Sequence, residues 1–300
     1  MKKILLCGAS LALAACGDNS SDSTSQLTLR LTDAPVVGVE SLVINLDYIE
    51  LKPAGGKAFT VEVSGVDEDM QTTDTAAIDL LNLQGSASTV LLDNIQVPSG
   101  KYEWLRLHLD ATTPAQLTTA DGEYPGGTFD LTIPSGENTG LKLHSPFILP
   151  ANGSADFVLD FDVAKSLVEN TKGYKLRPTI RIIDQVQAGH VSGTVDSNLL
   201  SGCGETAASV YVFDGSDAAL QDINLDKGTG PVASALVKYD AENTAYRFEV
   251  GYLLVGDYTL HVFCGVDNPE STETLTSLAS QNVTVVAKQN TSADFVVEAP

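Results

Sequence analysis

Oxygen-bearing side chains are the main chemical lead in this sequence. Asp222, Asn224 and Asp226 stand at alternate positions, the spacing with which calcium loops surround a hard cation with side-chain oxygens. The rest of the segment departs from that pattern, because Lys227 stands where the turn glycine is needed and Ala233 stands at the twelfth position instead of Glu. The segment is therefore either a weak calcium site or a solvated loop.

Two further carboxylates alternate along an expected strand. Asp160 and Asp162 would share one face of it, opposite Leu159 and Phe161. Such a pair could hold a cation or act like the carboxylates of a glycosidase, or it could face solvent or pair with Lys and Arg. Asp33, in an Asp-Ala-Pro turn, is expected to cap that turn rather than bind a ligand.

Other catalytic patterns are missing from the sequence. The four histidines are scattered without a His-Glu-x-x-His spacing, and there is no Gly-x-Ser-x-Gly elbow. Residues 202–207 fit a dinucleotide fingerprint formally, but they lead into a strand and are interpreted as a turn. We therefore expect a protein that is not an enzyme and that needs no cofactor, apart from the calcium alternative.

Four cysteines occur, and Cys203 and Cys264 lie far from the other two. In an oxidising compartment an even pair favours a disulfide, which would close a loop of about 61 residues and stabilise by roughly 4 kcal/mol. The alternative is two free thiols. A zinc site would need more ligands than this pair provides.

The beginning of the chain has the features of an export signal. Lys2 and Lys3 precede an apolar stretch at residues 4–13, and residues 13–15 read Leu-Ala-Ala directly before Cys16. The run resembles a bacterial lipobox, so residues 1–15 are expected to be cleaved and Cys16 to be acylated, with residues 16–26 as a flexible tether. Because Gly17 is not Asp, the outer membrane is the expected destination.

The chain is strongly acidic. It has 17 Lys and Arg against 39 Asp and Glu, for a net charge of −22. Such a surface repels nucleic acid and anionic head groups. With 43% hydrophobic residues, the 300-residue chain still has enough apolar material for two domains with their own cores.

Strands dominate the pattern from Leu27 onward. Period-2 alternation and frequent turn signals predict strands at residues 27–32, 42–51, 59–63, 101–110, 155–163 and 174–183, the last at an edge or with a bulge because it contains Pro178. Short helices are expected only at 79–83 and 163–170. The pattern changes near residues 185–188, so we expect β-sandwiches at 27–186 and 187–300.

Six segments of the first sandwich occur in a recognisable order: 29–35 (LRLTDAP), 79–83 (DLLNL), 98–102 (PSGKY), 140–142 (GLK), 159–162 (LDFD) and 176–178 (LRP). They resemble DUF4382, a domain family of bacterial lipoproteins with no agreed activity. The resemblance implies an exported β-sandwich and no particular chemistry.

Segments 189–195 (GHVSGTV), 248–250 (FEV) and 256–262 (GDYTLHV) are similar to strands of the carboxypeptidase regulatory-like, prealbumin-type fold. That resemblance implies a second, Ig-like or prealbumin-like sandwich in tandem, and again no catalytic residue. A long polar insertion at 215–230 departs from the usual pattern, which makes it the place to look for specific binding.

These observations favour a membrane-anchored, non-enzymatic lipoprotein of the cell envelope, facing the periplasm or the cell surface, that presents a binding or adhesion surface to a protein or glycan. One alternative is a carbohydrate-binding or enzyme-accessory module in which Trp104, Tyr124 or Tyr252 stacks on sugar rings. A second alternative is a hydrolase with a carboxylate pair, which would require a cleft where the carboxylates converge.

Overall fold

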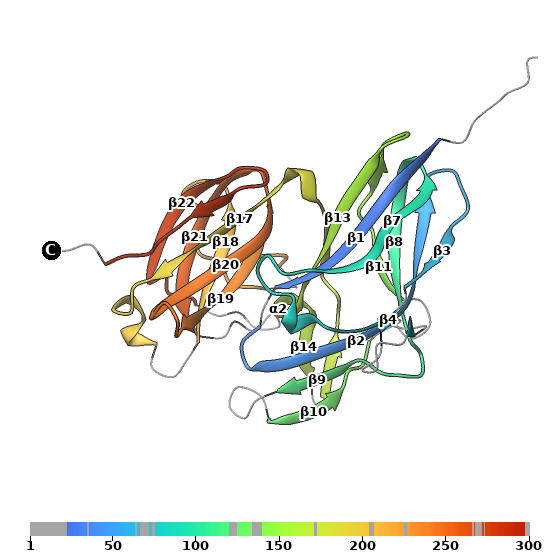
Figure 1. The fold of residues 1–300 in the computed structure, drawn as a ribbon. Helices are drawn as coiled ribbons and strands as arrows, with labels where there is room; N and C mark the ends of the chain where they lie inside the picture. The colour runs from blue at the N-terminus through green and yellow to red at the C-terminus, as the bar shows by residue number, and fades with distance from the viewer. Residues whose placement is uncertain are drawn as a thin grey trace, which may run out of the picture.

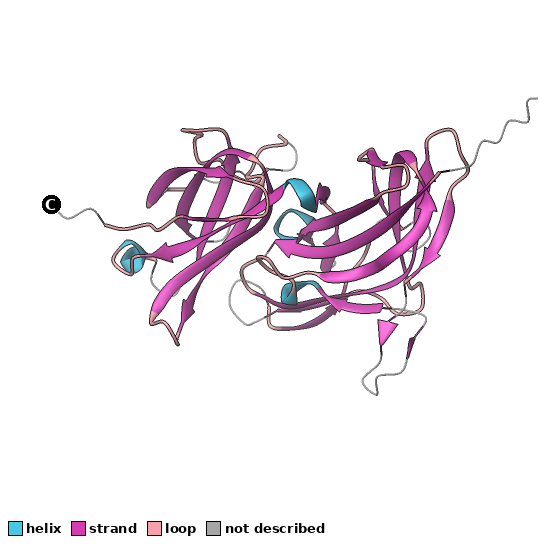
Figure 2. Ribbon diagram, turned by 45° about the horizontal axis from the view of Figure 1, so that its top comes forward, coloured by secondary structure: helices cyan, strands magenta, loops and turns pink. Residues whose placement is uncertain are grey.

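The computed structural model describes residues 23–34, 36–63, 65–66, 72–73, 76–119, 125–133, 140–170, 173–203, 207–224, 227–265, 267, 272 and 274–297. Strands make up most of this part of the chain, and its helices are single turns (Figure 2). The predicted signal peptide and Cys16 lie outside the described residues. The first strand begins at Thr24, within the segment expected to be tether.

None of the helices that the structure describes has the length and apolar character needed to cross a membrane.

Two packed sheets form the first unit, which we call the N-terminal sandwich (24–184). Its four-stranded sheet has the order β16 (Ile180–Asp184), β13 (Ser154–Asp162), β1 (Thr24–Ala34), β7 (Thr89–Pro98). Its larger sheet has the order β10 (Gly127–Asp130), β9 (Gln116–Thr119), β2 (Val39–Pro53), β8 (Gly100–Leu109), β11 (Leu141–Leu143). Three more strands belong to this sheet: β12 (Phe147–Leu149) pairs with β8, and both β3 (Phe59–Glu62) and β6 (Ala76–Asp79) pair with β2. Two small hairpins complete it, β4 (Gly65–Val66) with β5 (Thr72–Thr73) and β14 (Leu167–Asn170) with β15 (Gly173–Leu176).

The second unit, the C-terminal sandwich (188–295), follows the turn η2 (Gln185–Gln187). Its strands have the order β22 (Ala279–Val285), β21 (Gly256–Cys264), β18 (Ala208–Asp214), β19 (Ala233–Asp240), β20 (Ala245–Leu254), β17 (Ala188–Val195), β23 (Asn290–Ser292). The first half of β19 pairs with β18 and its last three residues pair with β20, so this strand joins the two halves of the sandwich. Cys203, after η3 (Leu199–Gly202), forms a disulfide with Cys264, with the two Cα atoms 5.2 Å apart.

The alternation in the sequence explains the two cores. Leu27, Leu29 and Leu31 of β1 point into the N-terminal sandwich and are almost fully buried. Val191, Val210 and other β-branched residues fill a separate core in the C-terminal sandwich. The all-β sandwich fold expected from the sequence is confirmed.

Three local predictions need correction. The helix expected at 163–170 is a single turn, α2 (Val163–Ser166), because residues 167–170 pair with β15 as β14. The helix at 79–83 is only the 3₁₀ turn η1 (Leu80–Asn82). The expected strand at 174–183 is two strands, β15 and β16, which belong to different sheets; Pro178, which has no N–H to donate to a ladder, lies between them.

Candidate functional site at the junction of the sandwiches

The carboxylates singled out in the sequence of the N-terminal sandwich lie where the two sandwiches meet. We call this region the junction; it comprises β13, β16, α2 and the segment 83–88 on one side, and β19, β20 and the loop 215–232 on the other (Figure 1). β13 is buried on both faces from Phe157 to Asp162. Phe157 and Leu159 enter the core of the N-terminal sandwich, whereas Val158 packs with Ile183, Ala188 and Tyr252 in a cluster that crosses the junction.

Two glycines let the backbones of the sandwiches approach closely. A Cβ on Gly251 of β20 would overlap the carbonyl group of Gly85. Beside this contact, the Tyr252 hydroxyl donates to the Ser86 carbonyl at 2.8 Å and also lies 3.0 Å from the Ser88 hydroxyl. Tyr252 keeps this position with a left-handed backbone, φ 52°, which an aromatic residue adopts rarely.

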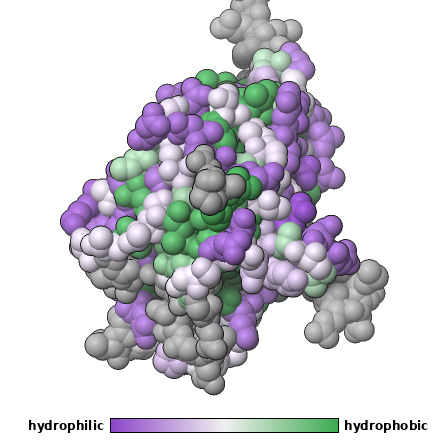
Figure 3. Space-filling model, turned by 90° about the vertical axis from the view of Figure 1, so that its left-hand side faces the viewer, coloured by the Kyte–Doolittle hydropathy of each residue, from purple (hydrophilic) through white to green (hydrophobic). Residues whose placement is uncertain are grey.

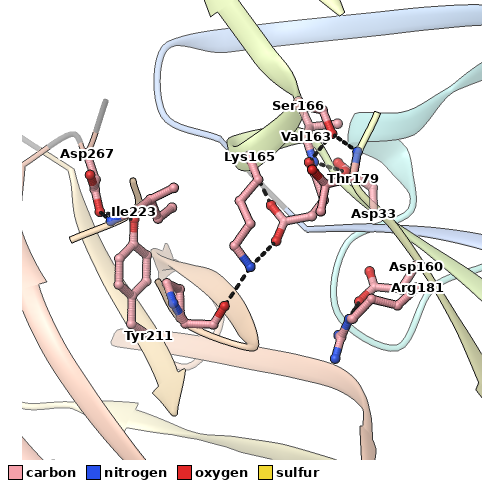
Figure 4. Close-up of polar contacts among 12 residues, drawn as sticks. Asp33, Asp160, Val163, Lys165, Ser166, Thr179, Arg181, Tyr211, Ile223 and Asp267 are labelled. Carbon is pink, nitrogen blue, oxygen red and sulfur yellow. Dashed lines mark hydrogen bonds and ion pairs between the residues drawn. The ribbon is translucent and has the colours of Figure 1, made fainter. Parts of the chain in front are cut away.

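Asp160 is held by the neighbouring strand. The antiparallel register of β13 and β16 places Asp160 opposite Arg181. The Arg181 guanidinium donates to one carboxylate oxygen of Asp160 through Nε at 3.0 Å and through a second nitrogen as well (Figure 4). The Asp160 side chain is only 9% exposed. Of the alternatives left open by the sequence, pairing with a basic residue describes this carboxylate.

Asp162 and Lys165 connect α2 to the other sandwich. Asp162 caps the helix by accepting from the Lys165 backbone N–H at 3.0 Å, and its second oxygen lies 2.8 Å from the Lys165 ammonium. The same ammonium donates at 2.5 Å to the carbonyl of Pro231, which precedes β19 in the C-terminal sandwich (Figure 4). One lysine therefore neutralises a buried carboxylate and bridges the junction.

Asp33 lies between the two ion pairs. Parallel pairing of β1 with β13 places Asp33 opposite Phe161, so its carboxylate lies near those of Asp160 and Asp162. It accepts from the Val163 N–H at 3.3 Å, and the Ala34 N–H of its own turn also interacts with it. Burial, and then the two neighbouring carboxylates, raise the pKa of Asp33 well above its ordinary value.

Asp33 and Asp160 also line a cavity of about 10 Å³ that is closed from the other side by Ser234, Gly251 and Tyr252. That volume is at the lower limit for one water molecule and too small for an organic substrate. The three carboxylates are thus gathered by the fold, but the space beside them does not form a substrate cleft.

The polar insertion 215–230 folds back onto the same junction. Ile223 packs with Tyr211, Phe213 and Phe263, and Ala164 of α2 contacts this cluster from the N-terminal sandwich. The Ile223 N–H donates at 2.9 Å to Asp267, which also accepts from the Tyr211 hydroxyl at 3.1 Å (Figure 4).

Asp267 was not singled out in the sequence. Burial and the proximity of Asp222 raise its pKa to about 7, although the donors at Ile223 and Tyr211 oppose the shift. Asn224 is buried; it accepts from the Lys227 N–H at 3.0 Å and donates to Thr272 at 3.1 Å. Asp226 lies outside the described residues, among which no group of three or more His, Cys, Asp and Glu side chains could hold a metal ion.

The aromatic side chains proposed for sugar stacking are occupied or not described. Tyr252 is buried at the junction. The ring of Trp104 is covered by the Lys142 ammonium at 4.4 Å and the Arg106 guanidinium at 4.8 Å from its centre. Tyr124 lies outside the described residues. Neither described ring is therefore available as an open platform.

Sequence reasoning also missed the cations that pair with these carboxylates. Lys165 follows Asp162 by three residues, which is a signal for a pair on one helical turn, and Arg181 alternates within an expected strand. The register that places Arg181 opposite Asp160 is not visible in the sequence, because it depends on which strands become neighbours.

Comparison with known proteins gives one family and several distant structures. Residues 24–178 match the family model described as "Domain of unknown function (DUF4382)". No curated protein sequence matches the chain. A Bacteroides fragilis protein described as a "putative cell adhesion protein" is 8% identical, with a TM-score of 0.22 over 90% of this chain and 91% of that one. The minor pilin of Streptococcus agalactiae is 9% identical, with a TM-score of 0.20 over 91% and 97%.

A leucine-rich repeat protein from Bacteroides thetaiotaomicron is 11% identical, with a TM-score of 0.23 over 92% of this chain. The present chain spans only 26% of that protein, and 34% of a Bacillus anthracis TIE protein. Likenesses this remote carry no information on activity.

Proposed function

The chain belongs to the DUF4382 family, and we propose that it is a membrane-anchored, non-enzymatic exported lipoprotein whose two sandwiches act as one unit that presents a binding surface. The anchor would be Cys16, acylated after removal of residues 1–15. The membrane would be the outer membrane.

The observation that carries this proposal is the way the junction uses its carboxylates. Asp160 and Asp162 are paired with Arg181 and Lys165, and burial raises the pKa of Asp33. A general acid or nucleophile must reach its substrate, but these carboxylates are buried at the junction, where the cavity beside them is too small for a substrate. They are better suited to joining two domains than to catalysis.

The arrangement of the two units supports a presenting role. β1 begins at the end of the N-terminal sandwich that lies away from the C-terminal sandwich (Figure 1). An anchor before β1 would therefore place the C-terminal sandwich farthest from the membrane. A junction made of buried apolar, ionic and hydrogen-bonded contacts would hold that sandwich in a defined direction.

Two further assignments belong to the proposal. The C-terminal sandwich would be a relative of the carboxypeptidase regulatory-like fold, starting near residue 187. The second is calcium binding at Asp222, Asn224 and Asp226. A calcium titration of the melting temperature tests it, with Asp222→Ala as the variant; a saturable rise that the variant loses would support it.

The anchor is tested by expressing the full chain in a diderm bacterium, with membrane fractionation and intact-mass analysis. We expect the wild-type chain in the membrane fraction, with a mass increased by acyl groups. Cys16→Ser should abolish both. Cys7→Ser is the matched control: its cysteine would be removed with the signal peptide, so the mature protein should be unchanged.

Finding the wild-type chain soluble and without lipid would contradict the proposal. So would a hydrolytic activity on glycoside, ester or peptide substrates that is lost in Asp160→Asn while the thermal melting of the variant stays that of the wild type. That second result would favour the carboxylate-pair hydrolase.

A further inference from the structure

A groove opens at the end of the C-terminal sandwich, away from the junction. Tyr239, the second-last residue of β19, is 56% exposed. It pairs across the two strands with Tyr246, and the ring centres are 5.2 Å apart with planes tilted by 60°. Together with Phe295 and Val296 these rings line a groove of about 510 Å³, a size typical of small-molecule sites.

The turn between the strands that carry the two tyrosines is held by internal hydrogen bonds. Asp240 accepts from the backbone N–H groups of Glu242 and Asn243 at 3.0 and 3.2 Å, and from the Asn243 side chain at 2.6 Å. Thr244 lines the groove with a left-handed backbone, φ 49°, which is strained for a β-branched residue. The rings are thus presented by a short, defined hairpin, which lowers the entropic cost of binding.

Polar groups surround the rings. The lining includes Thr194, Ser197 and Thr244, which carry hydroxyl groups, and Asp196, which carries a carboxylate. The hydroxyls of Thr194 and Thr244 donate to Asp294 and to the Asn243 carbonyl, both at 2.8 Å, so their oxygens can still accept. Asp196 is oriented by Asn198, whose backbone and side-chain N–H groups both donate to its Oδ1, at 2.8 and 2.9 Å. Apolar ring faces bordered by hydroxyl and carboxylate groups match a sugar, which has apolar C–H faces and hydroxyls at its edge.

We propose that this groove binds a neutral glycan, with Tyr239 and Tyr246 as the stacking platform. The inference rests on the proposed function, since it names the ligand class of the presented surface. A neutral sugar is favoured over an anionic one because Asp196 lines the groove, no Lys or Arg does, and the whole chain is acidic.

The position of the groove fits this role. Figure 3 views the molecule from the side of the C-terminal sandwich, and apolar residues gather on that face. Val296 and Val297 are among the exposed apolar residues, at 66% and 47%. A chain anchored before β1 would present this end outward.

The test uses the full chain in detergent, with immobilised neutral oligosaccharides of glucose, galactose, mannose and N-acetylglucosamine as probes and a polyuronate as the charged comparison. We expect saturable binding to at least one neutral probe and none to the polyuronate. Tyr239→Ala should weaken binding at least about tenfold, or about 1.4 kcal/mol. Tyr239→Phe keeps the ring and should bind within about threefold of the wild type.

Ile148→Ala is the control, because Ile148 is 69% exposed on the N-terminal sandwich; its binding should be unchanged. Silence of all neutral probes, or binding that Tyr239→Ala does not alter, would overturn the glycan assignment. Because lipidation is measured separately with Cys16→Ser, that failure would leave the proposed anchor standing. Crosslinking of Tyr239-dependent protein partners instead of sugars would likewise replace the ligand class and not the anchor.

Discussion

The junction and the groove of this protein use polar and aromatic residues in opposite ways. At the junction, Tyr252 is buried, its hydroxyl has a partner, and two aspartates are matched by Arg181 and Lys165. At the groove, Tyr239 is exposed and its ring lies beside that of Tyr246. Residue type alone therefore does not identify a binding site in this protein. A side chain whose partners lie within the protein contributes to stability, whereas an exposed side chain on an ordered hairpin can contact a ligand.

This contrast predicts that junction substitutions change stability and that groove substitutions change binding. Gly251→Ala should have the largest effect, because its Cβ would overlap the backbone of Gly85 and the sandwiches would have to move apart. We expect the free energy of unfolding to fall by about 2 to 3 kcal/mol. In calorimetry the two sandwiches should then unfold in two separate transitions. Gly256→Ala is the control, since its Cβ would meet only Tyr258 ring atoms at 3.6 Å or more. Equal melting of both variants would refute the close approach.

Asp160→Ala comes next. It leaves the Arg181 guanidinium without its partner at the junction. Because the Arg181 side chain is 32% exposed, we expect the free energy of unfolding to fall by about 2 kcal/mol, less than when a fully buried ion pair is broken. Asp156→Ala removes a comparable pair with Arg30, both side chains being about a third exposed, at 31% and 29%, and should cost less than about 1 kcal/mol. Urea unfolding measures both, and the reverse order would contradict the interpretation.

Tyr252→Phe should cost about 1 kcal/mol, because the Ser86 carbonyl loses its donor. Tyr258→Phe removes a similar bond, 2.9 Å to the Leu254 carbonyl, within the C-terminal sandwich. Hydrogen exchange separates the two: only Tyr252→Phe should speed exchange in segment 83–88 of the other sandwich. Unchanged exchange there would show that the hydroxyl does not couple the units.

A pH dependence follows from Asp267. Its pKa is about 7 in the fold against an ordinary 3.8, so the fold keeps a proton that the unfolded chain releases. The contribution of Asp267 to the free energy of unfolding is therefore full below about pH 4 and is lost as the pH rises to about 7. Buried Asp33, whose pKa is also raised, acts in the same direction. In Asp267→Asn the free energy of unfolding should fall less steeply with pH than in the wild type. The difference in slope should be less than about 1 kcal/mol per pH unit, because Asp267 is only half-buried. Urea unfolding across this range tests it; a slope equal to that of exposed Asp214→Asn would contradict it.

The smallest effect on stability is expected at the groove. Tyr239→Ala should change the free energy of unfolding by no more than about 0.5 kcal/mol, because the side chain is mostly in solvent. The same urea titration measures it. A decrease of more than about 2 kcal/mol in the free energy of unfolding would mean that the tyrosine pair stabilises the fold, as the junction residues do, and would contradict the comparison.

Much of the fold was predictable from local pattern. Alternation such as Leu27, Leu29, Leu31 identified strands and their buried faces, because a strand side chain points to one face or the other. It failed for residues 167–170, whose state depends on a hairpin partner. At the candidate site, Asp33, Asp160 and Asp162 were found by residue type. Arg181 and Asp267 were missed because their partners are distant in the sequence, and Lys165 was missed although its spacing from Asp162 gave a local signal.

The sequence by itself determined an acidic chain, the strand periodicity, the cysteine pair and the family motifs, because each is a property of residue type and local spacing. Only the tertiary structure decided that the outer face of β13 is covered rather than solvated, and that the insertion 215–230 packs on α2. It alone also left Tyr239 open while burying Tyr252. Such outcomes depend on which surfaces far apart in the chain come into contact, which no local pattern encodes.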